Sequence, residues 1–251
     1  MNWVLDLDGV VWLAETPIPG AADAVKRLQA GGEAVVFVTN NSLPTEAEYE
    51  AKLARQGIDG RGAVISSAMA AAALIAPGER VLVCGGPGVV EALQKHGATI
   101  IDVGQPDVVV VGFHRDFNYE RMRIAAAAVR GGARLVATND DATYPTPEGL
   151  IPGAGAILAG IERASGVRAI VAGKPYEPMA DIVRARLGDG EGTVVGDRPD
   201  TDGELARRLG YGFALVLTGV ITADEAGAVD PRPDRVAPDL ATLVDGYRTT
   251  G

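Results

Sequence analysis

The chain has 251 residues, 47% of them apolar, so it can form one large domain or two smaller ones around a sizeable core. Its formal charge of −10 argues against nucleic acid as a partner, because a polyanion would be repelled and no basic run offsets the charge. The presence of two histidines and one cysteine excludes a zinc site built on several histidines, and also an intramolecular disulfide.

The apolar runs and the lone cysteine also bear on location. No apolar run reaches the roughly 18 residues of a membrane span, and we expect neither membrane contact nor a secretory leader. Cys84 ends an apolar run, which favours a buried thiol over a reactive one. A single cysteine suits a reducing compartment, so we expect a cytoplasmic protein.

In chain order, short β-branched runs alternate with alanine-rich helical stretches. Strand-like runs lie within residues 3–8, 34–42, 63–67 and 80–86, and helical stretches lie within residues 20–32, 44–57, 68–76 and 87–97. Runs that are apolar on both faces and alternate with helices are typical of a parallel sheet covered by helices. The fold class predicted is α/β, with a Rossmann-like, doubly wound core.

A second module interrupts this core. Residues 79–170 hold strand candidates of their own, in "RVLVCG", "DVVVVGF" and "ARLVATN", together with helices. We therefore expect a catalytic core made of residues 1–78 and 171–251 and an inserted α/β cap domain made of residues 79–170. The segment 232–248 is predicted to close the core with a last strand and helix.

Polar residues follow several of the apolar strand-like runs. They are Asp6 and Asp8, Thr39 and Asn40, Lys174, and Asp197. Ligands of an open parallel sheet bind at the carboxyl ends of its strands. If the strands in question are parallel neighbours, these side chains converge on one edge of the sheet.

The "DLDG" stretch predicts covalent chemistry at this edge. The carboxylate of Asp6 can attack phosphorus and form an aspartyl-phosphate, which splits hydrolysis into two easier steps. Asp8 can protonate the leaving oxygen and then accept a proton from the attacking water. A turn or a helix cap after the strand is the alternative for this tetrapeptide alone.

Two further stretches are suited to holding a phosphoryl group. Thr39 and Asn40 offer a hydroxyl and backbone N–H groups at a loop-to-helix junction, where helix capping is the alternative. Lys174, framed by Gly173 and Pro175, can neutralise charge on a transferring phosphoryl group, whereas an ordinary surface lysine would need no such frame.

The stretch "VVGDRPDTD" predicts a hard metal. Carboxylate and carbonyl oxygens in a chain poor in histidine favour Mg²⁺. We expect the carboxylates of Asp6 and Asp197 and the backbone carbonyl of Asp8 to be its protein ligands. The alternative is an acidic surface turn, which the preceding apolar run disfavours.

The order D-x-D-G-V, V-T-N-N, G-K-P and G-D-R-x-x-T-D over nearly the whole chain resembles the haloacid-dehalogenase-like (HAD) phosphatase superfamily. It is most similar to the NagD-like and p-nitrophenylphosphatase-like subfamily, which carries a large cap between the second and third motifs. The resemblance implies that Asp6 is the nucleophile, that Asp8 is the acid/base, and that Asp202 is an acid supporting the metal. It further implies phosphate binding by Thr39, Asn40 and Lys174, and a cap surface that can serve a homo-oligomer.

The predicted function is Mg²⁺-dependent hydrolysis of a small phosphorylated metabolite. The substrates left open are p-nitrophenyl phosphate, glycerol phosphate, phosphoglycolate, a sugar phosphate and a nucleoside monophosphate. A catalytically idle ligand-binding protein on the same fold is one alternative, because fold alone does not establish function. A phosphotransferase or mutase, in which an alcohol replaces water, is the other.

The insert is expected to select the substrate. Its main candidate is the loop predicted over residues 138–153, where Asn139 and Asp141 follow an apolar run. A cap that closes could lower this loop onto the leaving group. Local hydrogen bonds within the loop are the alternative role for both residues. His114 follows another strand of the insert and is predicted either to face the substrate or to hold a loop.

Overall fold

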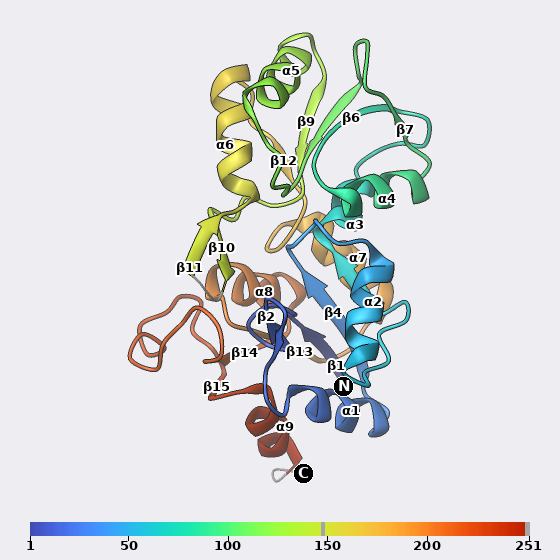
Figure 1. Cartoon of the computed structure of the whole chain (residues 1–251). Coiled ribbons are helices and arrows are strands. Elements are labelled where there is room, and N and C mark those ends of the chain that lie inside the picture. The colour runs from blue at the N-terminus through green and yellow to red at the C-terminus, as the bar shows by residue number, and fades with distance from the viewer. Residues whose placement is uncertain (147–148, 249–251) are drawn as a thin grey trace.

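The computed structural model describes residues 1–146 and 149–248. Two parallel sheets, each flanked by helices, lie one above the other, and both ends of the chain lie in the lower part (Figure 1). This architecture confirms the predicted α/β class. No helix among the described residues is long and apolar enough to cross a membrane.

The lower sheet has six strands in the order β15-β14-β13-β1-β4-β5, and all neighbouring strands are parallel. Its strands are β1 (Asn2–Leu5), β4 (Ala34–Thr39), β5 (Val64–Ser66), β13 (Gly192–Gly196), β14 (Gly212–Val216) and β15 (Arg235–Ala237). The central strand β1 lies between β4 and β13, so the residues that follow these three strands meet at one edge of the sheet.

The upper sheet has five strands in the order β12-β9-β8-β6-β7, again with parallel neighbours. Its strands are β6 (Arg80–Cys84), β7 (Thr99–Ile100), β8 (Val108–Val111), β9 (Arg134–Ala137) and β12 (Ile170–Val171). The domain boundaries proposed from the sequence, at residues 78/79 and 170/171, stay a prediction.

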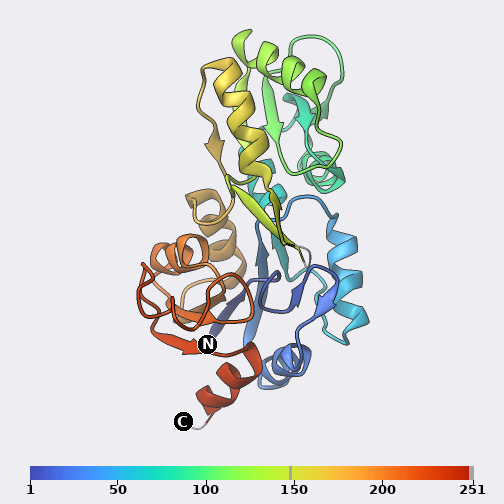
Figure 2. The ribbon, with the colours of Figure 1, turned by 60° about the vertical axis from the view of Figure 1, so that its left-hand side comes forward.

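Helices cover both faces of the lower sheet and also flank the upper one (Figure 2). They are α1 (Ala21–Ala30), α2 (Glu46–Arg55), α3 (Ser67–Ala72), α4 (Pro87–Lys95), α5 (Tyr119–Arg130), α6 (Ala154–Ser165), α7 (Glu177–Leu187), α8 (Glu204–Leu209) and α9 (Leu240–Arg248), with a π-helical turn η1 (Pro199–Gly203) before α8. The last strand and helix predicted for the core are therefore β15 and α9.

Alternation along β1 explains why both faces of the lower sheet need cover. Val4 packs into a cluster with residues of α3, α7 and α8, whereas Trp3 and Leu5 point into a second cluster with α1, α2 and α9. The first cluster continues to Val108 and Val110 of the upper sheet through α3 and α4. One apolar cluster thus joins the two sheets and holds them against each other.

The chain returns from the upper sheet at Lys174, which corrects one step of the sequence argument. The apolar run before Lys174 is β12, which pairs with β9 in the upper sheet and is not a neighbour of β1. Lys174 reaches the edge of the lower sheet because the chain crosses between the sheets directly before α7. A run of only two strand residues carries no sign of which sheet it joins.

Two antiparallel hairpins project over the edge where β1, β4 and β13 end. One is formed by β2 (Trp12–Leu13) and β3 (Thr16–Pro17), and the other by β10 (Thr143–Thr146) and β11 (Gly149–Pro152). The second hairpin descends from the upper part toward the lower sheet (Figure 2). The segment predicted as a loop is therefore a hairpin, although residues 147 and 148 within it lie outside the described residues.

Replacing Gly173 with alanine is expected to destabilise the crossing between the sheets. A Cβ atom there would lie 2.5 Å from both the backbone oxygen of Thr138 and Oδ1 of Asn40. Overpacking of this kind costs about 1–3 kcal/mol, which corresponds to roughly 2–4 °C of melting temperature per kcal/mol in a chain of this size. Thermal unfolding followed by circular dichroism measures the shift.

Gly227→Ala is the matched control, because a Cβ at Gly227 meets no described atom within 4 Å. A Gly173→Ala variant that melts at the temperature of this control would show that the crossing tolerates a side chain.

Candidate active site

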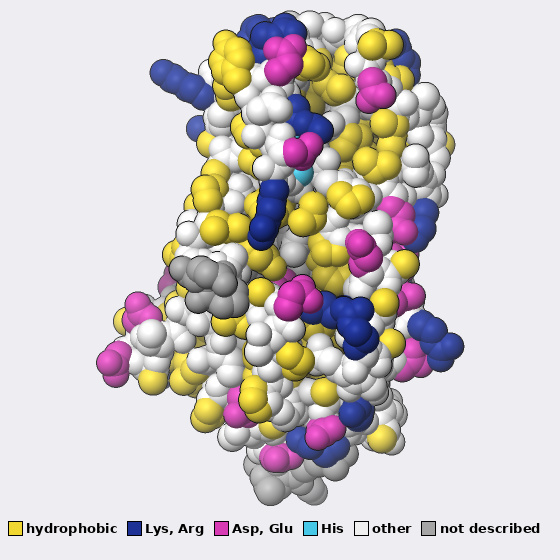
Figure 3. Space-filling view, viewed as in Figure 1, with side chains coloured by type: hydrophobic (Ala, Val, Ile, Leu, Met, Phe, Trp, Pro, Cys, Tyr) yellow, Lys and Arg dark blue, Asp and Glu magenta, His cyan; other side chains and the backbone are white. Residues whose placement is uncertain are grey.

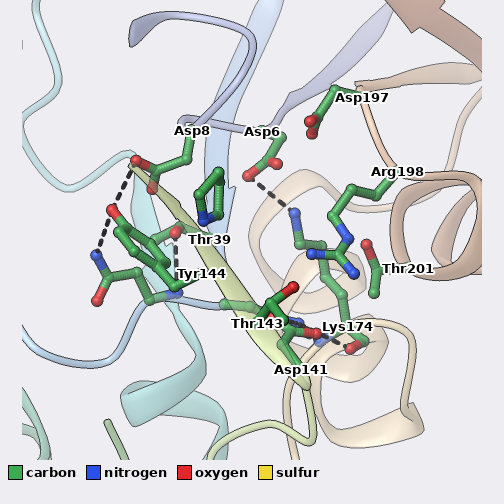
Figure 4. A pocket seen from close by; sticks show the side chains of 13 residues that line it. Asp6, Asp8, Thr39, Asp141, Thr143, Tyr144, Lys174, Asp197, Arg198 and Thr201 are labelled. Atoms are coloured by element: carbon green, nitrogen blue, oxygen red, sulfur yellow. Dashed lines mark hydrogen bonds and ion pairs between the residues drawn. The ribbon is translucent and has the colours of Figure 1, made fainter. Parts of the chain in front are cut away.

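A small cavity lies where β1, β4 and β13 end, under the hairpin β10–β11 (Figure 4). Its volume is about 40 Å³. It is lined by Asp6, Asp8, Thr39, Asn40, Asn41, Asp141, Thr143, Tyr144, Pro145, Lys174, Asp197, Arg198 and Thr201. We call it the site cavity. The polar residues singled out at the ends of strand-like runs therefore do converge.

Asp6 is held in place by the sheet itself. Its backbone N–H donates to the carbonyl of Val195 at 2.9 Å, which extends the pairing of β1 with β13 by one residue. Gly9 then turns the chain with φ of 88°. A Cβ at Gly9 would lie 2.6 Å from Cγ of Asp197, so both the backbone conformation and the space require glycine.

The ammonium group of Lys174 lies between two carboxylates. Its Nζ is 2.9 Å from Oδ1 of Asp6 and 2.6 Å from Oδ1 of Asp202, and all three side chains are buried. Burial by itself lowers the pKa of Lys174, but the charges of Asp202 and Asp6 outweigh it and raise the pKa above its usual value. Lys174 therefore carries its positive charge inside the protein.

Three carboxylates at this point form a cluster that fits a divalent cation. Oxygen atoms of Asp6, Asp197 and Asp202 lie within 4.8 Å of one another. Oδ1 of Asp197 is buried without a hydrogen-bond partner among the described residues, while Oδ2 accepts a bond of 2.8 Å from the N–H of Val220. A buried, unpartnered carboxylate oxygen beside two other acids is the donor set that Mg²⁺ prefers.

The raised pKa values of these acids also indicate a site for a cation. Burial raises the pKa of Asp197 to about 7, and the charge of Asp202 adds to the rise. Burial also raises the pKa of Asp6 well above its usual value, although Lys174 offsets part of the effect. A cation bound among these oxygens would remove the electrostatic reason for the raised pKa values.

Asp8 lies on the opposite wall of the site cavity, beside a residue that the sequence argument missed. The hydroxyl of Tyr144 donates to Oδ1 of Asp8 at 3.0 Å, and Nδ2 of Asn41 donates to that hydroxyl at 3.3 Å. Burial raises the pKa of Asp8, and the bond from Tyr144 lowers it in part. Tyr144 belongs to the upper sheet's hairpin, so the two parts of the chain meet at this acid (Figure 4).

Asn40 joins three segments through its side chain. Nδ2 donates to the backbone oxygen of Lys174 at 3.0 Å and to the carboxylate of Asp141 at 3.1 Å, and Oδ1 accepts from the N–H of Lys174 at 2.7 Å. Thr39, the last residue of β4, is buried, and its hydroxyl accepts from the N–H of Asn41 at 3.1 Å. Asn40 thus ties the returning chain and the hairpin's base to β4.

The residues predicted in the insert separate into two groups. Asp141 lines the site cavity, whereas Asn139 and His114 are not among its lining residues. Asn139 donates to the backbone oxygen of Asn40 at 2.6 Å and accepts from the N–H of Asp141 at 3.1 Å, so it bonds within its own turn and to β4. His114 is buried, with Nδ1 3.0 Å from the carbonyl of Gly112.

Cys84 is buried, as expected, and burial raises the pKa of its thiol to about 11. Arg198 and Thr201, which the sequence pattern did not single out, also line the cavity. Both belong to the quoted motif "GDRPDTD", so a signal for them was present. Tyr144 lies in the loop predicted to face the leaving group, but nothing in the sequence singled out its hydroxyl as a partner of Asp8.

Two family profiles match the chain: "haloacid dehalogenase-like hydrolase" over residues 3–99 and "HAD-hydrolase-like" over residues 171–243. The p-nitrophenyl phosphatase from Archaeoglobus fulgidus superposes with a TM-score of 0.91 at 33% identity, covering 98% of both chains. NagD from Escherichia coli superposes with a TM-score of 0.86 at 33% identity, covering 96% of both chains.

A glycerol phosphate phosphatase from Mycobacterium tuberculosis in complex with magnesium superposes with a TM-score of 0.88 at 35% identity, covering 96% of this chain and 75% of the other. These similarities extend over nearly the full chain, and they include both sheets. The chain therefore belongs to the haloacid dehalogenase-like hydrolase family, among its NagD-like and p-nitrophenylphosphatase-like members.

Proposed function

We propose that this protein is a magnesium-dependent phosphatase that hydrolyses small phosphate monoesters through an aspartyl-phosphate on Asp6. The observation that carries the proposal is the site cavity itself. It brings a buried carboxylate, Asp6, within 2.9 Å of a charged lysine, and it has a second acid, Asp8, on the facing wall. Its relatives are named as phosphatases of p-nitrophenyl phosphate and glycerol phosphate.

In the first half-reaction, an oxygen of Asp6 forms a bond to phosphorus while the bond from phosphorus to the ester oxygen breaks. The leaving oxygen takes the proton of Asp8. In the second, Asp8 takes a proton from a water molecule as its oxygen attacks phosphorus, and the bond between Asp6 and phosphorus breaks. Burial raises the pKa of Asp8, which favours the protonated form needed in the first step.

The other residues of the cavity neutralise and position the reacting groups. Lys174 stays charged and faces Asp6, so it can stabilise the phosphoryl group as charge develops on it. Thr39 and Asn40 also line the cavity, and the Thr39 hydroxyl and the Asn40 backbone are assigned to the phosphoryl oxygens. Tyr144 is a positioning residue, because it acts through its hydrogen bond to Asp8.

The residues present fit Mg²⁺. The carboxylates of Asp6 and Asp197 and the backbone carbonyl of Asp8 would hold it, and Asp202 would support it from the cluster the three acids form. When bound, the ion offsets the repulsion between the anionic nucleophile and the anionic phosphate. Asp202 also accepts from the N–H of Arg198 at 3.1 Å and pairs with Lys174, so it links the metal side of the cavity to the phosphate side.

The insert of residues 79–170 is assigned the role of a cap that selects the substrate. The hairpin β10–β11 supports this assignment, because it brings Asp141 and Tyr144 into the site cavity from the upper sheet. A homo-oligomer formed through the cap remains part of the proposal. So does a reducing, cytoplasmic location, which rests on the single buried cysteine, Cys84.

Asp6→Asn is expected to reduce hydrolysis of p-nitrophenyl phosphate to the background rate. The amide keeps the shape of the side chain but cannot attack phosphorus. Circular dichroism should show a folded protein, and rapid quenching of the parent enzyme should trap a phosphorylated protein that the variant lacks. Substantial turnover by Asp6→Asn would rule out the covalent mechanism, and absent turnover by the parent enzyme would favour an idle binding protein.

Removal of divalent cations is expected to abolish activity. Excess chelator should stop hydrolysis of p-nitrophenyl phosphate, and added Mg²⁺ should restore it, whereas Ca²⁺ should restore little because of its larger, looser coordination. Asp197→Asn should raise the Mg²⁺ concentration that gives half-maximal rate by at least about tenfold, since it removes a charged ligand. Full activity in chelator would contradict the assigned metal dependence.

Asp141→Ala is expected to lower kcat/KM by about tenfold, or roughly 1.4 kcal/mol, because Asp141 lines the cavity and holds Asn40. His114→Ala tests the same predicted role at a position outside the cavity lining, and we expect a smaller loss there. Steady-state kinetics on one natural ester and on p-nitrophenyl phosphate measure both. If His114→Ala lost more kcat/KM than Asp141→Ala, the recognition role would have to be assigned to the segment after β8 and not to Asp141.

A further inference from the structure

A groove opens beside the site cavity, along helix α2. Its volume is about 580 Å³. Its wall includes Trp12, Leu43, Tyr49, Lys52, Arg55 and Tyr144, and we call it the α2 groove. The groove and the site cavity share Asp8, Asn41 and Tyr144, so the two spaces meet at the catalytic acid.

The volumes of the two spaces indicate which part of a substrate each can hold. A buried water needs roughly 10–15 Å³, so the site cavity, at about 40 Å³, holds a phosphoryl group but little more. The organic part of a phosphate monoester must lie elsewhere. The α2 groove, more than ten times larger, has room for it.

The position of Asp8 gives the direction in which the organic part leaves. Asp8 must lie within hydrogen-bond reach of the leaving oxygen in order to protonate it. Because Asp8 belongs to the wall of both spaces, an ester oxygen beside it directs its carbon atoms into the α2 groove. The groove is therefore in the place that a leaving group would occupy.

Two cations of α2 face this groove. Lys52 and Arg55 are three residues apart in the helix and so lie on one face of it. The side chain of Arg55 is exposed and forms no hydrogen bond or ion pair with another residue of the described chain. At the level of α2, dark blue lysine and arginine side chains lie beside magenta acidic ones on the surface (Figure 3).

Two acids of the groove wall, Glu15 and Glu48, each have a partner. Glu48 is held in the capping box of α2, where Oε2 accepts from the N–H of Thr45 at 2.8 Å and from its hydroxyl at 3.0 Å. Glu15 pairs with Lys52 at 3.2 Å, but its side chain is 85% exposed, so water and salt weaken this pair. An anion in the groove could exchange with Glu15 at little cost.

Lys52 is the better ordered of the two cations. Its Nζ donates to the backbone oxygen of Ala14 at 2.5 Å and lies 4.3 Å from the ring centre of Trp12, and its side chain is only 16% exposed. Lys52 and Asp8 line the same groove, so a positive charge is held on the wall that carries the proposed acid.

We infer that the α2 groove binds the leaving group of the substrate and that Lys52 and Arg55 select leaving groups bearing a second anionic group, a carboxylate or a phosphate. This inference rests on the proposed phosphatase function. It assigns part of substrate choice to the lower sheet's own helix, in addition to the cap. Lys52 would contact a short leaving group, and Arg55, one turn farther along α2, would contact a longer one.

The test compares two esters that differ in one group. Glycerol 3-phosphate and 3-phosphoglycerate share a three-carbon chain and end in a hydroxymethyl group and a carboxylate, respectively. We expect kcat/KM of the parent protein to be at least about tenfold higher for the acid, close to 1.4 kcal/mol. Lys52→Gln and Arg55→Gln should each reduce this ratio, whereas Lys52→Arg should keep most of it.

Arg61→Gln is the matched control, because Arg61 is an exposed arginine that pairs with Asp59 and lies outside the groove lining. It should leave the ratio as in the parent protein. Lys52→Gln could loosen the β2–β3 hairpin through Trp12 and Ala14, so Arg55→Gln supplies an independent measurement at a side chain without such contacts.

Hydrolysis of p-nitrophenyl phosphate that depends on Asp6 separates the failure of this inference from the failure of the proposed function. If that hydrolysis is present but the acid is not preferred, or the ratio is unchanged in both glutamine variants, the inference is wrong and the function stands. A preference for phosphoethanolamine over both esters would likewise overturn it in favour of a cationic leaving group. If p-nitrophenyl phosphate is not hydrolysed, both fall.

Discussion

The buried ion pairs of Lys174 are the interaction on which the rest of the site depends. A single ammonium group lies between Asp6 and Asp202, with its Nζ at 2.9 and 2.6 Å from their oxygens. Removing one partner from a buried pair typically costs about 3–5 kcal/mol, because a charge is left uncompensated. Lys174 therefore both holds the returning chain against the lower sheet and places a positive charge beside Asp6.

The lysine does not balance all the negative charge around it. Asp197 adds a third buried carboxylate, and the pKa values of Asp6 and Asp197 are raised by burial together with the neighbouring acids. A protein that buries carboxylates in excess of cations keeps a site that a divalent cation can complete. The same excess of negative charge would repel a phosphate, and a bound cation would offset that repulsion.

The segment that leads into the β10–β11 hairpin contributes to the site cavity through two contacts. Asp141 accepts from the side-chain amide of Asn40, and Tyr144 donates to Asp8. Both residues come from the segment at the base and first strand of the β10–β11 hairpin. Because these contacts cross between the two parts of the chain, any movement of the upper sheet would change the surroundings of Asp8 and the phosphate-facing wall together.

The α2 groove adds a second consequence of the same geometry. Tyr144 donates to Asp8 and lines both the site cavity and the groove. Substrate choice in this protein would then be shared between the hairpin of the upper sheet and a helix of the lower one. Under this inference the small space takes the phosphoryl group and the large one takes the organic group.

The sequence by itself determined the alternating α/β pattern and the identity of most of the chemical groups. Asp6, Thr39 and Asp197 each follow or end an apolar strand, and a parallel sheet brings such positions to one edge, so local pattern and a general rule sufficed. Tertiary structure alone decided that the strand before Lys174 belongs to the other sheet and that Tyr144 reaches Asp8. Asp8 and Tyr144 are 136 positions apart, and such a contact depends on packing across the whole chain. The same holds for the choice of strand partners. Neither produces a periodic pattern in the sequence from which it could be predicted.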